Sequence, residues 1–450
     1  MKYLRTSRGH AAAASLLMAA SFLAGTVHAA DAEQTNPLQF YTGSNNSYAK
    51  ATLQVEVGLF DQGNSWFGNA REVLGEDSDS WWESLIRPGL EGSYFLPNTQ
   101  EIYGRVDAVQ ANTGGGLDAA ASNAGLGDVS DLRVENAYAG WRSGNLFSSL
   151  GENFLDISFG RQQYKVGDGF LLYSYAGSGG DRGAYWIGGR RAAEYAGIVR
   201  MKTGGLNVDL VYLENDPISN DSTELGGATV NYTFNDNASL GGGLYTLDSD
   251  IDSRDGMNVF DIRGGVKPFA AANGPEALRP LRFDAEYVHE DRDDGFDAGN
   301  GWHITTSYQF EQVAWQPTLS YRYASFDENY DTLFYGFADW GSWYQGEIIG
   351  EYVLGNSNLD SHMVKLKVQP LEPVAVSLFY YNFTIHDAGD FGVKDDAYAD
   401  ELDLVIDWSV NDHLSLSLVG ALAMPDDGAT EHTGGDDDWS YVMLYGSIKF

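Results

Sequence analysis

The sequence contains no cysteine, so the chain forms no disulfides and offers neither thiolate nucleophiles nor cysteine ligands for metals. It also lacks a long apolar run after the first 30 residues, and its mean hydropathy is only -0.30. Basic residues are few, with 27 Lys and Arg against 64 Asp and Glu, which disfavours a nucleic-acid partner. No HExxH or GxSxG motif occurs and the eight histidines are scattered, so the sequence predicts that the protein is not an enzyme.

The first 29 residues predict a secretory signal peptide. Three basic residues open it, an apolar run follows over residues 11–25, and Ala29 ends a short segment of the kind that signal peptidases cleave. The apolar run is too short to span a bilayer as a helix. We therefore expect cleavage after Ala29, with an exported chain remaining.

Residues 30–450 read as one domain of amphipathic strands, because no linker or break in composition divides them. Apolar side chains alternate with polar or charged ones, which is the period of a β-strand with two different faces. The clearest segments span residues 52–60, 228–234, 260–267, 281–287, 302–310, 364–369 and 402–408. A soluble β-sandwich has the same period, but the density of charge on the polar face favours a water-filled interior.

These strands predict an all-β fold, a transmembrane antiparallel β-barrel. Without apolar helices, only a closed barrel satisfies every backbone group in lipid. About nineteen segments qualify as strands, and because bacterial single-chain barrels have even strand numbers, we expect about 18.

The connections between strands alternate in length, as the hairpins of outer-membrane barrels do. Short connections, expected to be periplasmic turns, lie at residues 235–237, 311–313, 370–373 and 411–412. Long connections, expected to be extracellular loops, lie at residues 61–80, 111–130, 248–255, 291–299, 327–342, 385–399 and 425–438. This alternation predicts that the ends of the strands joined by long loops face the outside and the ends joined by short turns face the periplasm.

Residues 440–450 alternate to the last residue of the sequence and end on an aromatic, Phe450. Val442, Leu444 and Phe450 share one face, which we expect to meet lipid. This strand should pair with the first strand and close the barrel, and Phe450 resembles the signal read by the barrel-assembly machinery. We therefore expect the protein in the outer membrane of a Gram-negative bacterium, in contact with lipid and lipopolysaccharide.

Four stretches resemble the alginate-export family of outer-membrane barrels. They are DLRVENAYAGW at residues 131–141, ISFGRQ at 157–162, the long segment at 330–359 and ADELDLVIDW at 399–408. The resemblance implies an 18-stranded monomer with a charged lumen that passes an anionic polysaccharide or another hydrophilic solute. It also implies that Arg133 and Arg161 are lumen arginines, able to bind the carboxylates of a uronate chain bidentately.

Charged residues on the inward faces are the candidates for the pore lining, because selectivity comes from charges at the constriction. The cations expected to face inward by strand period are Arg105, Arg133, Arg263, Arg282, Arg322, Lys365 and Lys367. The interleaved acidic candidates include Asp107, Glu135, Asp284 and Glu347. The alternative is that these charges form a structural network of salt bridges without a role in selectivity.

Three arginines do not follow the simple strand period. Arg161 shares parity with Ile157 and Phe159, which should face lipid, so it points inward only if Gly160 supplies a β-bulge. Arg190 and Arg191 follow two glycines, which places them at a strand mouth or in a loop. All three are still candidates for binding an anionic solute.

The sequence predicts a channel for passive diffusion or export of hydrophilic, anionic solutes, either alginate-like polysaccharide or small organic acids and saccharides. Acids lining the pore would repel a polyanion, so a general cation-tolerant porin is one alternative. A non-transport barrel with a plugged lumen, such as an adhesin or receptor, is another. Many acids fall in the expected loops 291–299 and 425–438, where they predict solubility or a loop-bound divalent cation. No other metal and no cofactor is expected.

Overall fold

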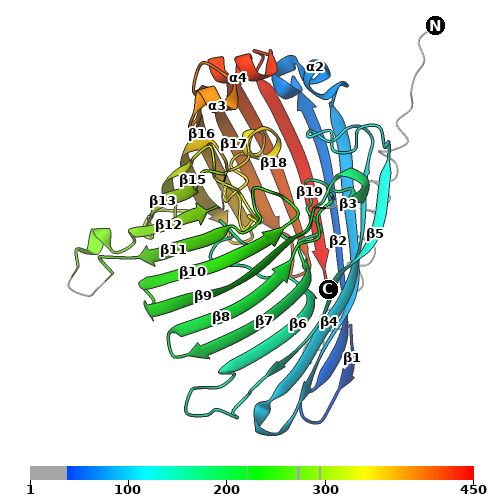
Figure 1. Ribbon diagram of the computed structural model, residues 1–450, viewed down its shortest axis with the longest axis vertical. Coiled ribbons are helices and arrows are strands. Elements are labelled where there is room, and N and C mark those ends of the chain that lie inside the picture. The colour runs from blue at the N-terminus through cyan, green and yellow to red at the C-terminus, as the bar shows by residue number, and fades with distance from the viewer. Residues whose placement is uncertain (1–37, 220, 271–273, 293–294) are drawn as a thin grey trace.

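The computed structural model describes residues 38–450, apart from residues 220, 271–273 and 293–294, and shows a single antiparallel sheet of 19 strands (Figure 1). The predicted signal peptide lies outside the described residues. The strands are β1 Gln39–Thr42, β2 Tyr48–Gly63, β3 Ser80–Phe95, β4 Glu101–Gly114, β5 Val129–Arg142, β6 Leu155–Gln162, β7 Ala193–Thr203, β8 Leu206–Glu214, β9 Thr223–Asn235, β10 Ala238–Ser249, β11 Asn258–Val266, β12 Arg282–Asp291, β13 Gly299–Gln309, β14 Thr318–Phe326, β15 Leu359–Leu371, β16 Val374–Ile385, β17 Ala397–Ser409, β18 Leu414–Pro425 and β19 Trp439–Lys449.

The sheet closes on itself. Each strand from β2 onward pairs with the next, and β19 returns to pair with β2, with Ser440 opposite Gly63 and Lys449 opposite Gln54. The short strand β1 pairs with β2 beyond the end of β19. The barrel therefore has 18 strands with β1 as an addition, which confirms the predicted fold and its closure by the last strand.

The two faces of the wall differ in chemistry. In β5, Leu132 is 63% exposed and Val134 49% exposed on the outer face, whereas Glu135 on the inner face is fully buried. Other strands repeat this pattern, as the alternation in the sequence predicted. A closed barrel with an apolar outer surface meets lipid on all sides, which places the protein in a Gram-negative outer membrane.

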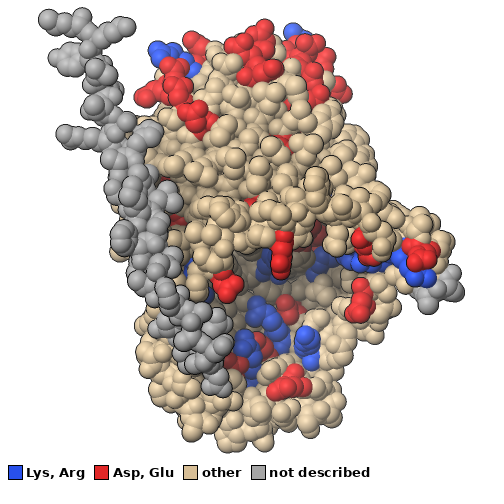
Figure 2. All heavy atoms as spheres, turned by 180° about the vertical axis from the view of Figure 1, so that it is seen from behind, with Lys and Arg blue, Asp and Glu red and all other residues tan. Residues whose placement is uncertain are grey.

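The helices are short and lie in the connections. They are η1 Ser65–Gly68, α2 Ala70–Leu74, η2 Pro97–Thr99, η3 Gly180–Arg182, η4 Glu276–Leu278, η5 Ile349–Val353, α3 Ala388–Phe391 and α4 Asp427–Thr433. Among the described residues, no helix is long and apolar enough to cross a membrane. The helices α2, α3 and α4 lie together at one end of the barrel, and acidic side chains gather at that end (Figures 1 and 2). This arrangement agrees with acidic extracellular loops.

Two long loops fold into the lumen instead of standing outside it. They comprise residues 163–192, between β6 and β7, and residues 327–358, between β14 and β15, and are called the inserted loops below. Leu172 and Phe334 form a parallel bridge between them, and Tyr173 N donates to Phe334 O at 2.7 Å. The sequence predicted only residues 327–342 as an extracellular loop and did not identify 163–192 as one.

Three buried carboxylates on the wall hold the inserted loops in place. Each accepts hydrogen bonds from two consecutive backbone N–H groups: Glu83 from residues 186 and 187, Glu135 from residues 191 and 192, and Glu401 from residues 348 and 349. All three side chains are fully buried. Each acid satisfies two backbone donors that would otherwise be buried without a partner, so the three acids fix the position of the inserted loops in the lumen.

Candidate functional site

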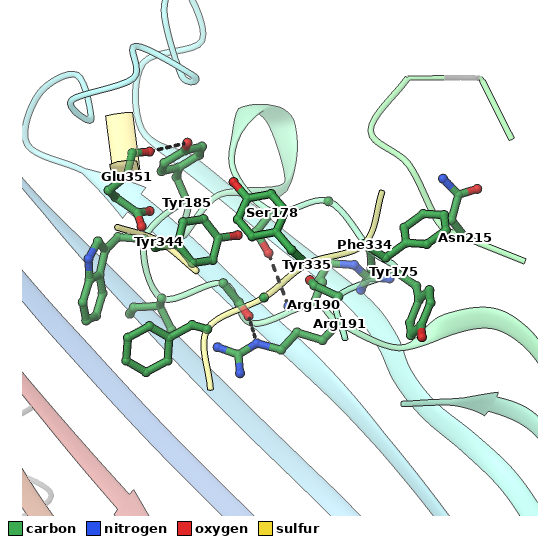
Figure 3. Close-up of a pocket in the computed structure, with 18 of the residues that line it drawn as sticks. Tyr175, Ser178, Tyr185, Arg190, Arg191, Asn215, Phe334, Tyr335, Tyr344 and Glu351 are labelled. Carbon is green, nitrogen blue, oxygen red and sulfur yellow. Dashed lines mark hydrogen bonds between the residues drawn. The ribbon is translucent and has the colours of Figure 1, made fainter. Parts of the chain in front are cut away.

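A cavity of about 510 Å³ lies between the two inserted loops and the barrel wall. Aromatic side chains form much of its surface, among them Tyr185, Tyr335 and Tyr344, and Ser417 of β18 and Tyr445 of β19 complete it from the wall. Its charged lining residues are Arg190, Arg191, Arg254, Glu347 and Glu351. Figure 3 shows Glu351 beside Tyr185 and Tyr344 at one end, and the two neighbouring arginines farther along.

Three arginines converge on one carboxylate next to this cavity. Arg182 and Arg190 reach Asp216 at 2.9 Å and 2.6 Å, and Arg161 also pairs with it. Burial alone would raise the pKa of Asp216, but hydrogen bonds from Arg190 and Arg161 and the charge of the arginines lower it to about 2. Asp216 is thus a permanent anion that neutralises part of the cluster.

Arg191 differs from its neighbours because it has no ion pair within the described part of the chain. Its backbone N–H is held by Glu135 at 2.7 Å, while its guanidinium donates to Gly188 O at 3.1 Å and to the hydroxyl of Tyr173 at 3.3 Å. Lys165 lies over the same Tyr173 ring. Arg191 therefore brings an uncompensated positive charge to the cavity.

The two acids of the cavity belong to an inserted loop. Burial raises the pKa of Glu347 to about 8, and burial together with the charges of Glu347 and Glu83 raises the pKa of Glu351. With a pKa of about 8, Glu347 is largely protonated near neutral pH, and the raised pKa of Glu351 shifts that group in the same direction. Strand period predicted Glu347 as a lumen residue. It does line the cavity, but from the loop at residues 327–358, so the prediction that it lies on a strand was wrong.

Most of the other predicted cations are compensated by nearby acids, four on the wall itself and Lys365 by Asp339 of the inserted loop 327–358. Arg105 pairs with Asp107 and Glu91, and the remaining pairs are Arg133–Asp131, Arg263–Asp261, Arg282–Asp284 and Lys365–Asp339. For these five residues the structure agrees with a network of salt bridges. Figure 2 shows basic side chains inside a hollow of the molecule, with acidic ones among them.

Besides Arg191, two predicted cations have no ion pair in the described residues. Arg322 is buried in β14, where its guanidinium lies 4.6 Å from the ring of Trp343 and donates to Gln345 at 3.3 Å. The inserted loop covers it, so it is not available to a solute. Lys367 is exposed on β15.

The predicted bulge at Gly160 is confirmed and explains how Arg161 faces inward. The register between β6 and β7 shifts between Gly160 and Gln162, and Gly160 has a φ of 122°, which is unfavourable for residues with a Cβ. Phe159 stays on the lipid face at 66% exposure, while Arg161 reaches the cluster. One glycine therefore decides the direction of a lumen arginine.

Substituting Gly160 by alanine should destabilise the barrel by about 2–4 kcal/mol and disturb the cluster. A Cβ at this position would lie 2.3 Å from Ala137 O and would also strain the backbone. Unfolding by heat or denaturant measures the effect, with the fraction of folded barrel determined from its compact migration on gels. Gly226→Ala is the matched control, because nothing lies within 4 Å of its Cβ position. Equal stability of the two variants would contradict the role given to the bulge.

Sequence reasoning missed Arg182 and Asp216, which complete the cluster. Both lie in connections between strands, where alternation gives no information about direction. It also missed Arg254, which lines the cavity and pairs with Asp331 at 2.7 Å. The two glycines before Arg190 gave the only local signal, and they indicated a loop.

A scan against models of protein families finds no match for this chain, and a comparison with curated proteins finds none. Solved structures match by fold. OprD of Pseudomonas aeruginosa is 14% identical with a TM-score of 0.57, over 89% of this chain and 95% of its own. OccAB1 of Acinetobacter baumannii is 14% identical with a TM-score of 0.57, over 89% and 97%. OpdK of P. aeruginosa, solved with vanillate, is 12% identical with a TM-score of 0.56, over 89% and 98%. The chain thus shares a porin-like barrel.

Proposed function

We propose that this protein is an outer-membrane diffusion channel with a bias toward small hydrophilic anions, carboxylates above all. The observation that carries the proposal is Arg191, a cation without an acidic partner among the described residues, on the surface of a cavity between the inserted loops. The acids of the cavity have raised pKa values, about 8 for Glu347, so they cancel less of this charge near neutral pH than ordinary carboxylates would. A guanidinium binds a carboxylate through two parallel hydrogen bonds.

The dimensions of the cavity favour a small solute. About 510 Å³ is within the range of sites for small ligands, and the aromatic lining suits the apolar part of an organic acid. The structural neighbour OpdK was solved with vanillate, an aromatic carboxylate, which is the class of solute proposed here. An alginate-like polymer, implied by the resemblance in the sequence, is much larger than this cavity and would have to pass the inserted loops.

Neutralising Arg191 should reduce the preference for anions. We expect Arg191→Gln to lower the anion-to-cation permeability ratio about fivefold, which corresponds to about 1 kcal/mol for a unit charge at 4 Å in water. The measurement is the reversal potential of single channels in planar bilayers under a salt gradient. Arg133→Gln is the control, because Arg133 is paired with Asp131 at 2.6 Å and does not line the cavity.

The same recordings separate the alternatives. Block of the current by a monomeric uronate or benzoate at low concentration supports a channel for small acids, whereas block only by oligomeric alginate favours polysaccharide export. Cation selectivity in the wild type would mean a general cation-tolerant porin. No conductance would mean a plugged barrel, an alternative that the inward fold of the two loops keeps open.

We also propose that the barrel works as a monomer surrounded by lipid and lipopolysaccharide and that the barrel-assembly machinery reads Phe450. In the folded barrel the backbone of Phe450 exchanges hydrogen bonds with Leu53 of β2, at 2.9 and 3.2 Å. Its ring stacks on His413 in the turn before β18, with centroids 4.6 Å apart. Recognition of Phe450 would therefore have to precede the closing of the barrel.

A further inference from the structure

Three potential metal ligands from different elements meet on the inner face of the barrel. They are Asp168 in the inserted loop 163–192, Glu286 in β12 and His303 in β13. One oxygen of each carboxylate and one ring nitrogen of the histidine lie within 4.8 Å of one another. Glu286 and His303 are directly opposite each other in the strand register, so the wall fixes two of the ligands and the loop brings the third.

Glu286 is a buried carboxylate with an unused oxygen. It is only 5% exposed, and its Oε1 has no hydrogen-bond partner in the described structure. The neighbouring Arg263 is already committed to Asp261 and, at 2.6 and 2.8 Å, to Thr229 and Asn231. A buried carboxylate is costly unless a cation or donor compensates it, so this oxygen points to a missing partner.

The surroundings orient the other two ligands. The ring of His303 is 4% exposed and packs between Phe170 and Trp343, with centroids 5.2 and 4.7 Å away. Trp343 also donates its indole N–H to Oδ1 of Asp168 at 3.0 Å. Metal ligands are commonly held by such outer contacts, which reduce the rearrangement needed on binding.

We propose that Asp168, Glu286 and His303 bind one divalent cation of the zinc class. An imidazole with two carboxylates suits zinc and its first-row neighbours, whereas calcium takes six to eight oxygen ligands. Bonds of about 2.0–2.2 Å in a tetrahedron place ligand atoms roughly 3.4 Å apart, which side-chain rotation can reach from the observed spacing. Asp168 is exposed on the lumen side, which leaves the fourth position to water or a solute.

This ion would tie the inserted loop to strands β12 and β13. The same loop carries Arg190 and Arg191, so the metal would help to fix the wall of the cavity that lies between the loops. The two carboxylate ligands would balance the charge of the ion, and its open coordination position could still accept a carboxylate from the lumen. The proposed metal site shares no residue with the proposed role of Arg191. Metal binding can therefore be tested without any measurement of transport.

Calorimetric titration of the metal-free, folded channel with ZnCl₂ tests the proposal directly. We expect one ion per chain, with binding at least tenfold weaker in Asp168→Asn and in His303→Ala. Asp168 lies in a loop and is exposed, so its variant should fold even if His303→Ala does not. Asp181→Asn is the control, because Asp181 lies in the same loop, is 67% exposed and belongs to no such cluster.

Cobalt gives a second, local readout. Co²⁺ at a four-coordinate site with a nitrogen ligand produces visible absorption bands, which should appear with one equivalent and disappear on addition of Zn²⁺. The bands should be absent in Asp168→Asn and unchanged in Asp181→Asn. Two results would overturn the assignment. One is the absence of stoichiometric Zn²⁺ binding by the wild type. The other is equal binding by Asp168→Asn, because the ion would then be held by other histidines or by the acidic loops.

Discussion

Replacing the inserted loop at residues 327–358 by a short turn should raise the single-channel conductance several-fold and abolish ion selectivity. Phe326 and Leu359 are opposite each other at the ends of β14 and β15, so a turn of four residues can join them without changing the strand register. The deletion removes one side of the cavity, including Glu347 and Glu351. Water and ions would then fill the freed part of the lumen.

The recordings need a control in which an extracellular loop is shortened without opening the constriction. The loop at residues 386–396, between β16 and β17, serves this purpose because it contributes no residue to the cavity lining. Its shortening should leave the conductance within about a factor of two, since the two inserted loops and the cavity between them are unchanged. If both deletions have the same small effect, the constriction lies elsewhere in the barrel.

Asp216→Asn should make the channel markedly more selective for anions and increase its current noise. The substitution removes the carboxylate shared by Arg161, Arg182 and Arg190, which leaves Glu135, 3.9–4.0 Å from Arg161 and Arg190, as the remaining nearby acid. An uncompensated unit charge is worth about 1 kcal/mol at 4 Å in water, or about fivefold in the permeability ratio. Repulsion among the arginines should also loosen the loop that carries Arg190.

The reversal potential measures this effect. Asp181→Asn is the control for the loss of one negative charge, because Asp181 is 67% exposed and its carboxylate lies 3.9 Å from the guanidinium of Arg133, outside the cluster around Asp216. Titration of Asp216 should cause no corresponding change in the wild type between pH 4 and pH 6, below the range in which Glu347 titrates. The pKa of Asp216 is lowered from its ordinary 3.8 to about 2, so its ionised form stabilises the fold fully above about pH 4. That contribution is lost only as the pH falls through 2. Unaltered selectivity in Asp216→Asn would mean that ions do not sense the cluster.

The barrel was predictable because its strands obey one physical rule at every position. A strand between lipid and an inner polar space must alternate, and Leu132, Val134 and Glu135 show this rule directly. The C-terminal strand was assigned to closure for the same reason, and β19 does pair with β2. Even the exception at Gly160 could be anticipated, because the parity of Arg161 conflicted with that of Phe159.

The site could not be predicted to the same extent, because its residues lie on loops that have no period. The convergence of Arg182 and Arg190 on Asp216 depends on two separate connections, residues 163–192 and residues 215–222, meeting in the lumen. Strand period predicted Glu135 as a lumen acid but not its role as an acceptor for the backbone of Arg191 and Ala192. It also could not show that most wall cations would find acids beside them and that Arg191 would not.

The pairing of β19 with β2 means that the barrel closes when its last strand is in place. The two strands at the seam are separated by nearly the whole chain, so the edge of β2 beyond β1 stays open until the last residues arrive. An open edge in lipid leaves unsatisfied backbone groups, and it can pair with another chain. A nearly complete chain therefore carries an open strand edge that a second copy could pair with, until β19 reaches β2.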